Sequence, residues 1–274
     1  MKHIIETKST IYKSLCSFRF FVISGIALIF FALLTFSCSN FNKNSDSFTI
    51  HGQFSNCTGE KILLEEMDIN AIIPLDSANI DHEGNIRFTH KTNQAGFYLL
   101  RFPDRKKILL LLDKNENLEI AGDCQKPAED LILKGSQETL LLTNFFKTTN
   151  RKRKTVDSLK AVIHAHEDNP DFLKISADAD AGFQRISENQ RKLELEFIIN
   201  NPNSLACLIV LNFSFGPRPI LDIDHDFFYY QKVDSCLQII YPNNKHVIYH
   251  HQRVMERKRQ ESVKRLKETS TKRE

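Results

Sequence analysis

Short segments in which hydrophobic and polar residues alternate run from Phe48 to Ser136. Such a period of two is typical of β-strands that bury one face. Turn signals rich in Gly, Asn and Pro separate the segments. The pattern predicts eight strands, near residues 48–54, 61–67, 72–80, 85–91, 97–102, 108–113, 117–121 and 131–134. Short strands at this spacing indicate an antiparallel β-sandwich or a partly open barrel.

One segment departs from the alternation. Residues 108–112 read Ile-Leu-Leu-Leu-Leu and are therefore apolar on both faces. A strand that buries both faces needs a cover from outside its own sheet. We expect this strand to lie in the centre of a sheet, with the second half of the chain packed against its outer face.

From Gln137 onwards the hydrophobic positions follow a helical period instead. Leu141, Phe145 and Phe146 begin a first helix. The apolar residues at 156–163 either continue this helix or begin another. Asn169-Pro170 interrupts the pattern, because proline lacks an amide donor and disfavours a helical residue before it.

About five helices are expected in all. Apolar residues recur at steps of three, four or seven from Phe172 to Phe197, which predicts one long amphipathic helix. Three further helices follow near residues 205–211, 227–241 and 246–267. The sequence thus predicts an α+β chain, in which a β-rich domain of residues 48–136 precedes a helical region of residues 137–274.

The first 37 residues have the pattern of a secretory signal. A segment with four basic residues and Glu6 precedes an apolar stretch at 20–36. Cys38 follows directly, in Leu34-Thr35-Phe36-Ser37-Cys38. This resembles the lipobox of bacterial lipoproteins, with departures at Thr35 and Phe36. The pattern predicts a signal peptide of residues 1–37, lipid attachment at Cys38 and a tether linker over residues 38–47.

Two alternatives remain for this segment, an uncleaved membrane anchor at residues 20–36 and a cleaved soluble protein. All three interpretations place the body of the chain outside the cytoplasm. We expect a protein of the cell envelope that a lipid holds to a membrane on the extracytoplasmic, periplasmic side.

The charge distribution argues against a nucleic-acid partner. The chain has 37 basic and 34 acidic residues, a formal net charge of +3. Residues 1–37 account for all of this excess, so the rest of the chain is neutral overall. A body that binds nucleic acid normally carries a basic surplus.

A set of short motifs resembles a known family. The β-rich region contains Lys61-Ile62-Leu63-Leu64, Leu75-Asp76-Ser77-Ala78, Gly84-Asn85-Ile86-Arg87-Phe88, Gly96-Phe97-Tyr98-Leu99 and Leu133-Lys134-Gly135-Ser136. The stretch from Thr49 to about Leu142 resembles a β-rich domain of unknown function. That domain occurs at the amino terminus of envelope thioredoxin-like lipoproteins, the peroxiredoxin-related and thiol-disulfide interchange group. Residues 197–204 and 241–243 resemble the helical connector of these proteins.

The resemblance implies the fold but not the redox activity of these relatives. Their connector leads into a thioredoxin-like domain with a Trp-Cys-x-x-Cys site, whereas this sequence contains no Trp and no Cys-x-x-Cys. Thiol exchange needs an attacking thiolate and a resolving thiol close to it. We expect no cofactor.

Four cysteines remain beyond the leader and the lipid site, namely Cys57, Cys124, Cys207 and Cys236. An oxidising compartment permits disulfides. Cys207 and Cys236 lie on successive predicted helices and are the pair that we suspect first. The alternatives are four free thiols that pack as small apolar side chains, or a redox-active thiol.

An acidic cluster has the spacing of a calcium loop. Asp222, Asp224 and Asp226 would begin the loop, but its sixth position is Phe227 instead of Gly and its twelfth is Val233 instead of Glu. We interpret the cluster as a solvated turn that caps the following helix.

Two histidine pairs and a basic run are also interpreted as structural. His164-x-His166 and His250-His251 lack the spacing that places two zinc ligands on one helix face, so surface histidines are expected. The run at residues 151–154 is interpreted as a solvated loop or helix end, with contact to anionic lipid headgroups as the alternative. No metal site is predicted.

The sequence favours a non-catalytic binding or interaction module over an enzyme. Its β-rich domain would present loops or a groove to an envelope protein or a small ligand. An alternative is an accessory protein of a separately encoded thioredoxin-like thiol-disulfide oxidoreductase. A third is an enzyme whose site is assembled from scattered residues such as Asp76, Ser77 and His51, although no catalytic motif points to them.

Overall fold

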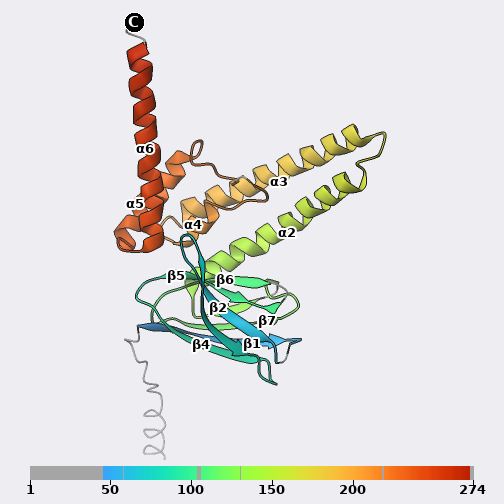
Figure 1. The fold of residues 1–274 in the computed structure, drawn as a ribbon, viewed down its shortest axis with the longest axis vertical. Helices are drawn as coiled ribbons and strands as arrows, with labels where there is room; N and C mark the ends of the chain where they lie inside the picture. The colour runs from blue at the N-terminus through green and yellow to red at the C-terminus, as the bar shows by residue number, and fades with distance from the viewer. Residues whose placement is uncertain (1–45, 58, 104–105, 130, 218, 272–274) are drawn as a thin grey trace, which may run out of the picture. The chain divides into compact units, whose positions relative to one another are not determined.

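The computed structural model describes residues 46–271, except residues 58, 104–105, 130 and 218. The predicted signal segment and Cys38 lie outside the described residues. The described residues belong to one compact unit, in which eight strands precede five helices, as expected for an α+β chain (Figure 1). None of the described helices is both long and apolar enough to span a membrane.

The strands form two four-stranded sheets. One sheet has the order β4-β1-β7-β8 and the other has the order β3-β2-β5-β6. Their bounds are β1 Ser47–Ser55, β2 Lys61–Met67, β3 Ile72–Asn79, β4 Asn85–Lys91, β5 Gly96–Arg101, β6 Lys107–Leu112, β7 Asn117–Asp123 and β8 Ile132–Lys134. The expectation of antiparallel pairing holds except between β1 and β7, which run parallel.

The alternating apolar positions of the two sheets meet in one core. β1 contributes Phe48, Ile50 and Phe54, and β6 contributes Leu110 and Leu112, all of them buried. Successive side chains of a strand point to opposite faces, so every second residue reaches this core. The period of two in the sequence is therefore the pattern that forms the sandwich.

β6 is apolar on both faces, as its sequence predicts, but it lies at the edge of its sheet. The expectation of a central strand is therefore wrong. Leu109 and Leu111 face away from the sandwich core and pack in a second core with the helices. The edge is tolerated because α2 (Gln137–Ala165) begins beside it and supplies hydrogen-bond partners.

The start of α2 is bound to the free edge of β6. Ser136, the N-cap of α2, donates from Oγ to the Leu111 carbonyl at 3.0 Å. Thr139 Oγ1 donates to the same carbonyl at 2.7 Å and accepts from the Leu111 amide at 3.0 Å. Gly135 lies just before this cap with φ of +92°, where a Cβ would collide with the Asn117 carbonyl. Only glycine fits at that turn.

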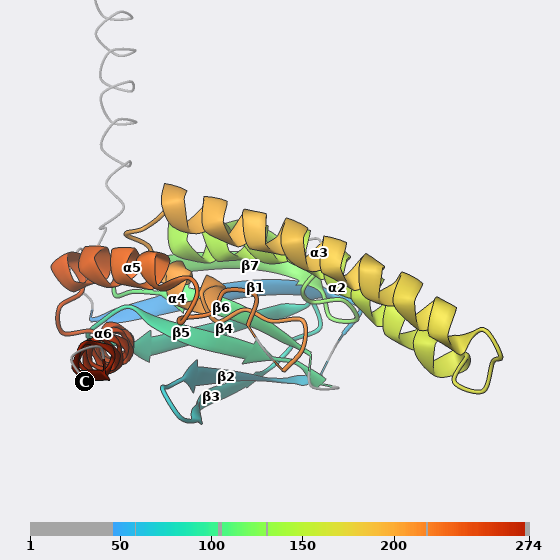
Figure 2. The same cartoon turned by 90° about the horizontal axis from the view of Figure 1, so that it is seen from above.

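α2 and α3 (Phe172–Asn200) lie side by side in both ribbon views (Figures 1 and 2). α2 is continuous through the basic run, so residues 156–163 continue the first helix. Asn169-Pro170 lies in the turn between the two helices, as expected. A Cβ at Gly182 of α3 would lie 3.1 Å from Cδ1 of Leu159 in α2. The glycine therefore allows the two helices to approach closely.

Three further helices complete the second core, namely α4 (Ala206–Val210), α5 (Phe227–Ile240) and α6 (Lys245–Thr271). Their apolar residues pack with Phe97 and Leu111 of the sheet. The turn before α6 is bound to the residue that precedes β5, because Asn244 Nδ2 donates to the Ala95 carbonyl at 2.7 Å. The second core therefore contains side chains from both the sheet and the helices.

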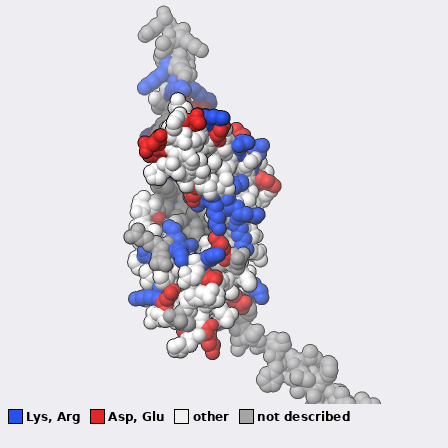
Figure 3. All heavy atoms as spheres, turned by 90° about the vertical axis from the view of Figure 1, so that its right-hand side faces the viewer, with Lys and Arg blue, Asp and Glu red and all other residues white. Residues whose placement is uncertain are grey.

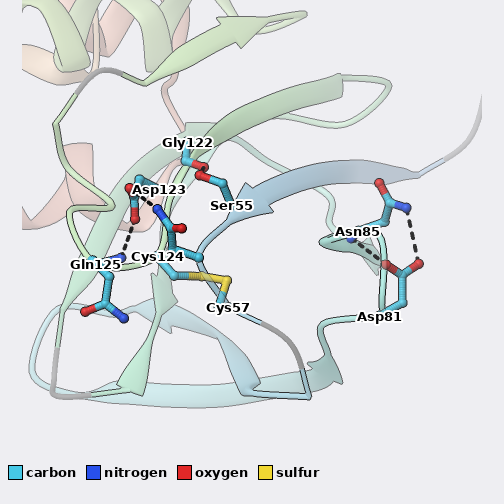
Figure 4. The surroundings of a disulfide bond; sticks show 9 residues. Ser55, Cys57, Asp81, Asn85, Gly122, Asp123, Cys124 and Gln125 are labelled. Atoms are coloured by element: carbon cyan, nitrogen blue, oxygen red, sulfur yellow. Dashed lines mark hydrogen bonds between the residues drawn. A yellow bond between two sulfur atoms is a disulfide. The ribbon is translucent and has the colours of Figure 1, made fainter.

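A disulfide joins Cys57 and Cys124, whose Cα atoms are 5.8 Å apart (Figure 4). The two residues follow the ends of β1 and β7, which are parallel neighbours, and the Cys124 amide donates to the Ser55 carbonyl at 3.0 Å. Both cysteines therefore leave the sheet at the same end.

The pairing of Cys207 with Cys236 that the sequence suggested is wrong, because both remain free thiols. Cys207 is fully buried in α4, where its thiol donates to the Asn201 carbonyl at 3.1 Å. Burial raises the pKa of this thiol, and Glu138 and Cys236 raise it further. Cys207 therefore packs as a small apolar side chain.

Replacing Thr139 by Val keeps the side-chain shape and removes the hydroxyl that serves both the amide and the carbonyl of Leu111. Since the Leu111 amide is then buried without its partner, we expect the free energy of unfolding to fall by about 1–3 kcal/mol. Urea denaturation followed by circular dichroism measures this change. Thr155→Val, at an exposed position of the same helix, is the control and should change stability by less than about 0.5 kcal/mol. Equal losses in both variants would contradict the role of Thr139 at the strand edge.

The disulfide joins residues separated by 67 positions. Since it restricts the unfolded chain over this long loop, the double substitution Cys57→Ser/Cys124→Ser should lower the free energy of unfolding by about 2–5 kcal/mol. Urea denaturation with and without a reducing agent tests this. Cys207→Ser is the control, because this variant keeps the disulfide and should stay sensitive to the reducing agent. A wild-type protein that is insensitive to reduction would rule the disulfide out.

Candidate ligand-binding site

The scattered residues of the enzymatic alternative do not share a sheet. His51 lies on β1 of one sheet, whereas Asp76 and Ser77 lie exposed on β3 of the other. The Asp76 carboxylate accepts from the neighbouring Ser77 amide at 2.7 Å. The described contacts therefore join Asp76 to Ser77 but do not bring His51 together with them.

The acidic cluster before α5 is only partly the solvated turn that we expected. Asp224 is exposed, but Asp226 is buried and its carboxylate forms a bidentate ion pair with Arg191 of α3. The Asp222 amide donates to the same carboxylate at 2.9 Å. Asp226 is the N-cap residue of α5 without a side-chain cap bond, because this ion pair and the Asp222 amide occupy its oxygens.

His250 is not the surface histidine that the sequence suggested. His164 is exposed, as expected, but His250 is 2% exposed. Its Nε2 lies 3.0 Å from the Tyr230 carbonyl, and its ring stacks on the Tyr230 ring. Val247, His250 and Val254 follow steps of three and four along α6, so His250 occupies the apolar face of that helix.

One group of described residues has the composition of a metal site. The ligand atoms of Cys57, Glu60 and Cys124 all lie within 4.8 Å of one another. In this structure the two sulfur atoms are bonded to each other. Metal ligation requires thiolates, so the group does not fit a metal ion while the disulfide is intact.

A recess of about 620 Å³ lies where the β2–β3 turn, α2, the segment after α4 and α6 meet. We call it the junction recess. Its volume is within the range of about 300–1,000 Å³ that is usual for small-molecule sites. It is lined by Met67, Asp68, Ile69, Phe97, Phe146, Arg153, Leu208, Ile209, Asn212, Phe213, Ser214, His246, Tyr249, His250 and Arg253.

Two arginines supply positive charge to the junction recess. Arg153 of α2 donates to the Ser214 carbonyl at 3.1 Å, and its guanidinium lies over the Phe213 ring at 5.4 Å. Arg253 of α6 donates to Asn212 Oδ1 at 2.9 Å. Among the described residues no carboxylate pairs with either guanidinium. Both arginines are therefore held in place by neutral groups and keep charge for an anion.

Asp68 is the one acid among the described lining residues, and its charge is already matched. Its Oδ1 lies 3.0 Å from Lys245 Nζ, which also lies 2.5 Å from Glu66. The hydrogen bond from Lys245 lowers the pKa of Asp68, which keeps this carboxylate ionised. The arginines therefore face no unpaired acid from this wall of the recess.

His246 adds a polar group without a partner. It is 8% exposed and lines the recess, and its ring packs edge-on against Phe97 with centroids 4.9 Å apart. Its Nε2 makes no hydrogen bond to any part of the chain that the structure describes. Burial, aided by the charge of Lys245, lowers the pKa of His246 to about 4. A buried polar atom without a partner is uncommon and calls for an explanation, such as a bound ligand or water.

The four basic residues at 151–154 of α2 lie in different surroundings. Lys152 Nζ donates to the Asn189 carbonyl at 3.0 Å, and Lys154 pairs with Glu129 at 2.7 Å. Figure 3 shows Lys and Arg side chains gathered between the helices and the sandwich. The run lies inside α2 and not in a loop or at a helix end, so that part of the prediction is wrong, while Arg151 is exposed as expected. The run in the sequence showed the charges but not that Arg153 reaches a recess.

The comparisons with known proteins concern the β-rich part of the chain. Residues 48–142 match the family model of a domain of unknown function, DUF4369. This match confirms the resemblance to a β-rich domain of unknown function, while the association with thioredoxin-like proteins stays a prediction. No curated protein sequence matches the chain.

A solved structure with some similarity is the 5-hydroxyisourate hydrolase of Klebsiella pneumoniae, at 15% identity. The match covers 33% of this chain and 93% of the hydrolase, with a TM-score of 0.23. A likeness at this level supports no conclusion about the fold or the activity of this chain. The DUF4369 match supports the fold of the β-rich domain alone.

A second polar cluster lies between α2 and α3. Gln190 Nε2 donates to Glu194 Oε1 at 3.0 Å and to Thr149 Oγ1 at 3.2 Å. Glu194 is fully buried, and its Oε2 has no hydrogen-bond partner among the described residues. Burial raises the pKa of Glu194 to about 8, although Lys152 and Arg191 act in the opposite direction. The carboxyl is therefore protonated at neutral pH.

This pKa predicts how stability depends on pH. The pKa of Glu194 is about 8 when folded and about 4.3 when unfolded, so the folded state binds more protons between these values. The contribution of this carboxyl to the free energy of unfolding should be fully present below about pH 4.3. As the pH rises to 8, that contribution should be lost by at most about 1.4 kcal/mol per pH unit. Urea denaturation of the wild type and of Glu194→Gln from pH 5 to pH 8 measures the difference.

Glu188→Gln, at an exposed position of α3, is the control and should keep the pH profile of the wild type. Glu194→Gln should instead gain stability relative to the wild type as the pH rises. Profiles of the wild type and Glu194→Gln that stay parallel would show that Glu194 ionises normally.

Proposed function

We propose that this protein is a membrane-tethered extracytoplasmic lipoprotein that binds a small ligand in the junction recess without transforming it. The β-sandwich supplies one wall of the binding site and the helices supply the others. The proposed location is the cell envelope, on the periplasmic side.

The tether is supported by the sequence around Cys38. A charged segment, an apolar stretch and a cysteine follow one another in the order found in bacterial lipoproteins. Each buried methylene of an acyl chain contributes about 0.8 kcal/mol to membrane binding, so two or three chains would hold the body firmly. A lipid on Cys38 would leave the linker of residues 38–47 between the membrane and β1.

The binding role is supported by the construction of the junction recess. Four separate segments of the chain converge there, and each contributes a polar side chain to an otherwise largely apolar lining. The single observation that carries the proposal is that Arg153 and Arg253 face the recess without a carboxylate partner, while His246 Nε2 lacks a hydrogen bond. Apolar walls with a few convergent polar groups are the usual composition of ligand sites.

These polar groups are suited to holding a ligand rather than to transferring protons. Guanidinium groups stay protonated at any physiological pH. His246, with a pKa of about 4, accepts a proton poorly at neutral pH, where an efficient general base has a pKa close to 7. We therefore propose a binding protein rather than an enzyme.

The alternative of a redox accessory protein depends on accessible sulfur. Cys57 and Cys124 are 9% and 4% exposed, so a partner thiolate would have to displace the surrounding loops to reach their bond. Their position at the ends of two paired strands favours a structural disulfide. Exchange with a thioredoxin-like partner stays the second hypothesis, and trapping of a mixed disulfide would establish it.

Intact mass spectrometry of the protein extracted from its own membranes tests the proposal. We expect a covalent mass that lacks residues 1–37 and includes acyl chains on Cys38. We also expect a small molecule that stays bound under native ionisation, because the recess offers it charge and apolar contact. Ser214→Trp, which places an indole in the recess, should lose that molecule.

The matched control is Ser158→Trp, at an exposed position of α2 outside the recess, which should keep the bound molecule. An unprocessed mass would overturn the tether. A molecule retained by Ser214→Trp, or absent from the wild type, would overturn the junction recess as the binding site.

A further inference from the structure

A second hollow lies beneath α2, next to the junction recess. This hollow has a volume of about 310 Å³ and lies between α2 and the outer face of β5 and β6. We call it the α2 slot. Met67 and Phe146 line both the recess and the slot. The two hollows are therefore neighbours that these two half-buried side chains separate.

The two hollows differ in chemistry. The α2 slot is walled mainly by aliphatic and aromatic carbon, from Leu99, Leu109, Leu131 and Phe146. Within the part of the chain that the structure describes, no acidic side chain lines it, and its one charged residue is the exposed Lys107. The junction recess, in contrast, carries the guanidinium groups of Arg153 and Arg253 and a single acid that Lys245 already neutralises.

We infer that the recess and the slot together bind a single-chain amphiphile with an anionic headgroup, of the chemical class of long-chain monocarboxylates. Its headgroup lies near Arg153 and Arg253, and its apolar chain passes Met67 and Phe146 into the α2 slot. This inference rests on the proposed function, since it names the ligand of that same site.

The chemistry of the two hollows favours this ligand over a compact polar one. A carboxylate matches the planar guanidinium group through paired hydrogen bonds. An alkyl chain in the slot buries its own apolar surface together with that of the slot walls, whereas a polar ligand has little apolar surface to bury. Methionine has flexible torsions, so Met67 can move aside to open the passage between the two hollows.

Photolabelling of the full chain tests the inference. The protein is placed in nanodiscs of phosphatidylcholine, with a hexadecanoic acid that carries a diazirine near its methyl end as the probe. We expect the label on peptides that contain Leu109 and Phe146, and we expect unlabelled hexadecanoic acid to compete. The corresponding diazirine alcohol shows how much of the labelling depends on the anionic headgroup.

Two sets of variants separate the headgroup site from the chain site. Arg153→Gln/Arg253→Gln should reduce labelling by the acid at least about tenfold, because two charge-assisted contacts are lost, and should leave labelling by the alcohol unchanged. Arg151→Gln is the matched control, since Arg151 is an exposed arginine of the same helix that lines neither hollow. Ala128→Trp fills the slot from an exposed position and should reduce labelling by both probes.

Circular dichroism establishes that each variant is folded. Equal labelling by acid and alcohol, or acid labelling that is unchanged in the double arginine variant, would overturn the anionic headgroup. Label spread over exposed peptides would overturn the α2 slot as the chain site.

If the protein from its own membranes instead carries a compact polar molecule that Ser214→Trp loses, this inference fails while the proposed function stands. If the recess binds nothing, both fail.

Discussion

The structure depends on the burial of β5 and β6 on both of their faces. Leu110 and Leu112 point into the sandwich core, whereas Phe97 and Leu111 point to the opposite side and pack with the helices. A sheet with two apolar faces is not stable in water unless both are covered. The hydroxyl groups at the start of α2 then bind the open edge of β6, so the helices and the sandwich share one interior.

The candidate site lies where this cover is incomplete. α2 covers the outer face of the sheet only in part and leaves the α2 slot beside Leu109, while α4 and α6 leave the junction recess beside Phe97. Because the recess needs walls from both the sheet and the helices, neither half of the chain contains the site alone. The contact between the halves thus has a consequence for function as well as for stability.

Local patterns made most of the fold predictable. The period of two, together with the apolar run at residues 108–112, located the eight strands, and helical spacing with Asn169-Pro170 located the helices. Features that depend on distant segments were not predictable. The pairing of Cys57 with Cys124 follows from the parallel contact of β1 and β7, which no local pattern encodes. The sequence drew attention to His250 and Arg153 as parts of a histidine pair and a basic run. Only the packing of α6 and α2 shows that His250 is buried and that Arg153 lines a recess.

The most direct test of this account is a crystal structure of the protein purified from its own membranes without removal of bound molecules. The account predicts elongated density that is not protein, with its polar end near Arg153 and Arg253 and its length passing Phe146 into the α2 slot. Ordered water alone in the recess, together with a slot closed by its own side chains, would contradict the account.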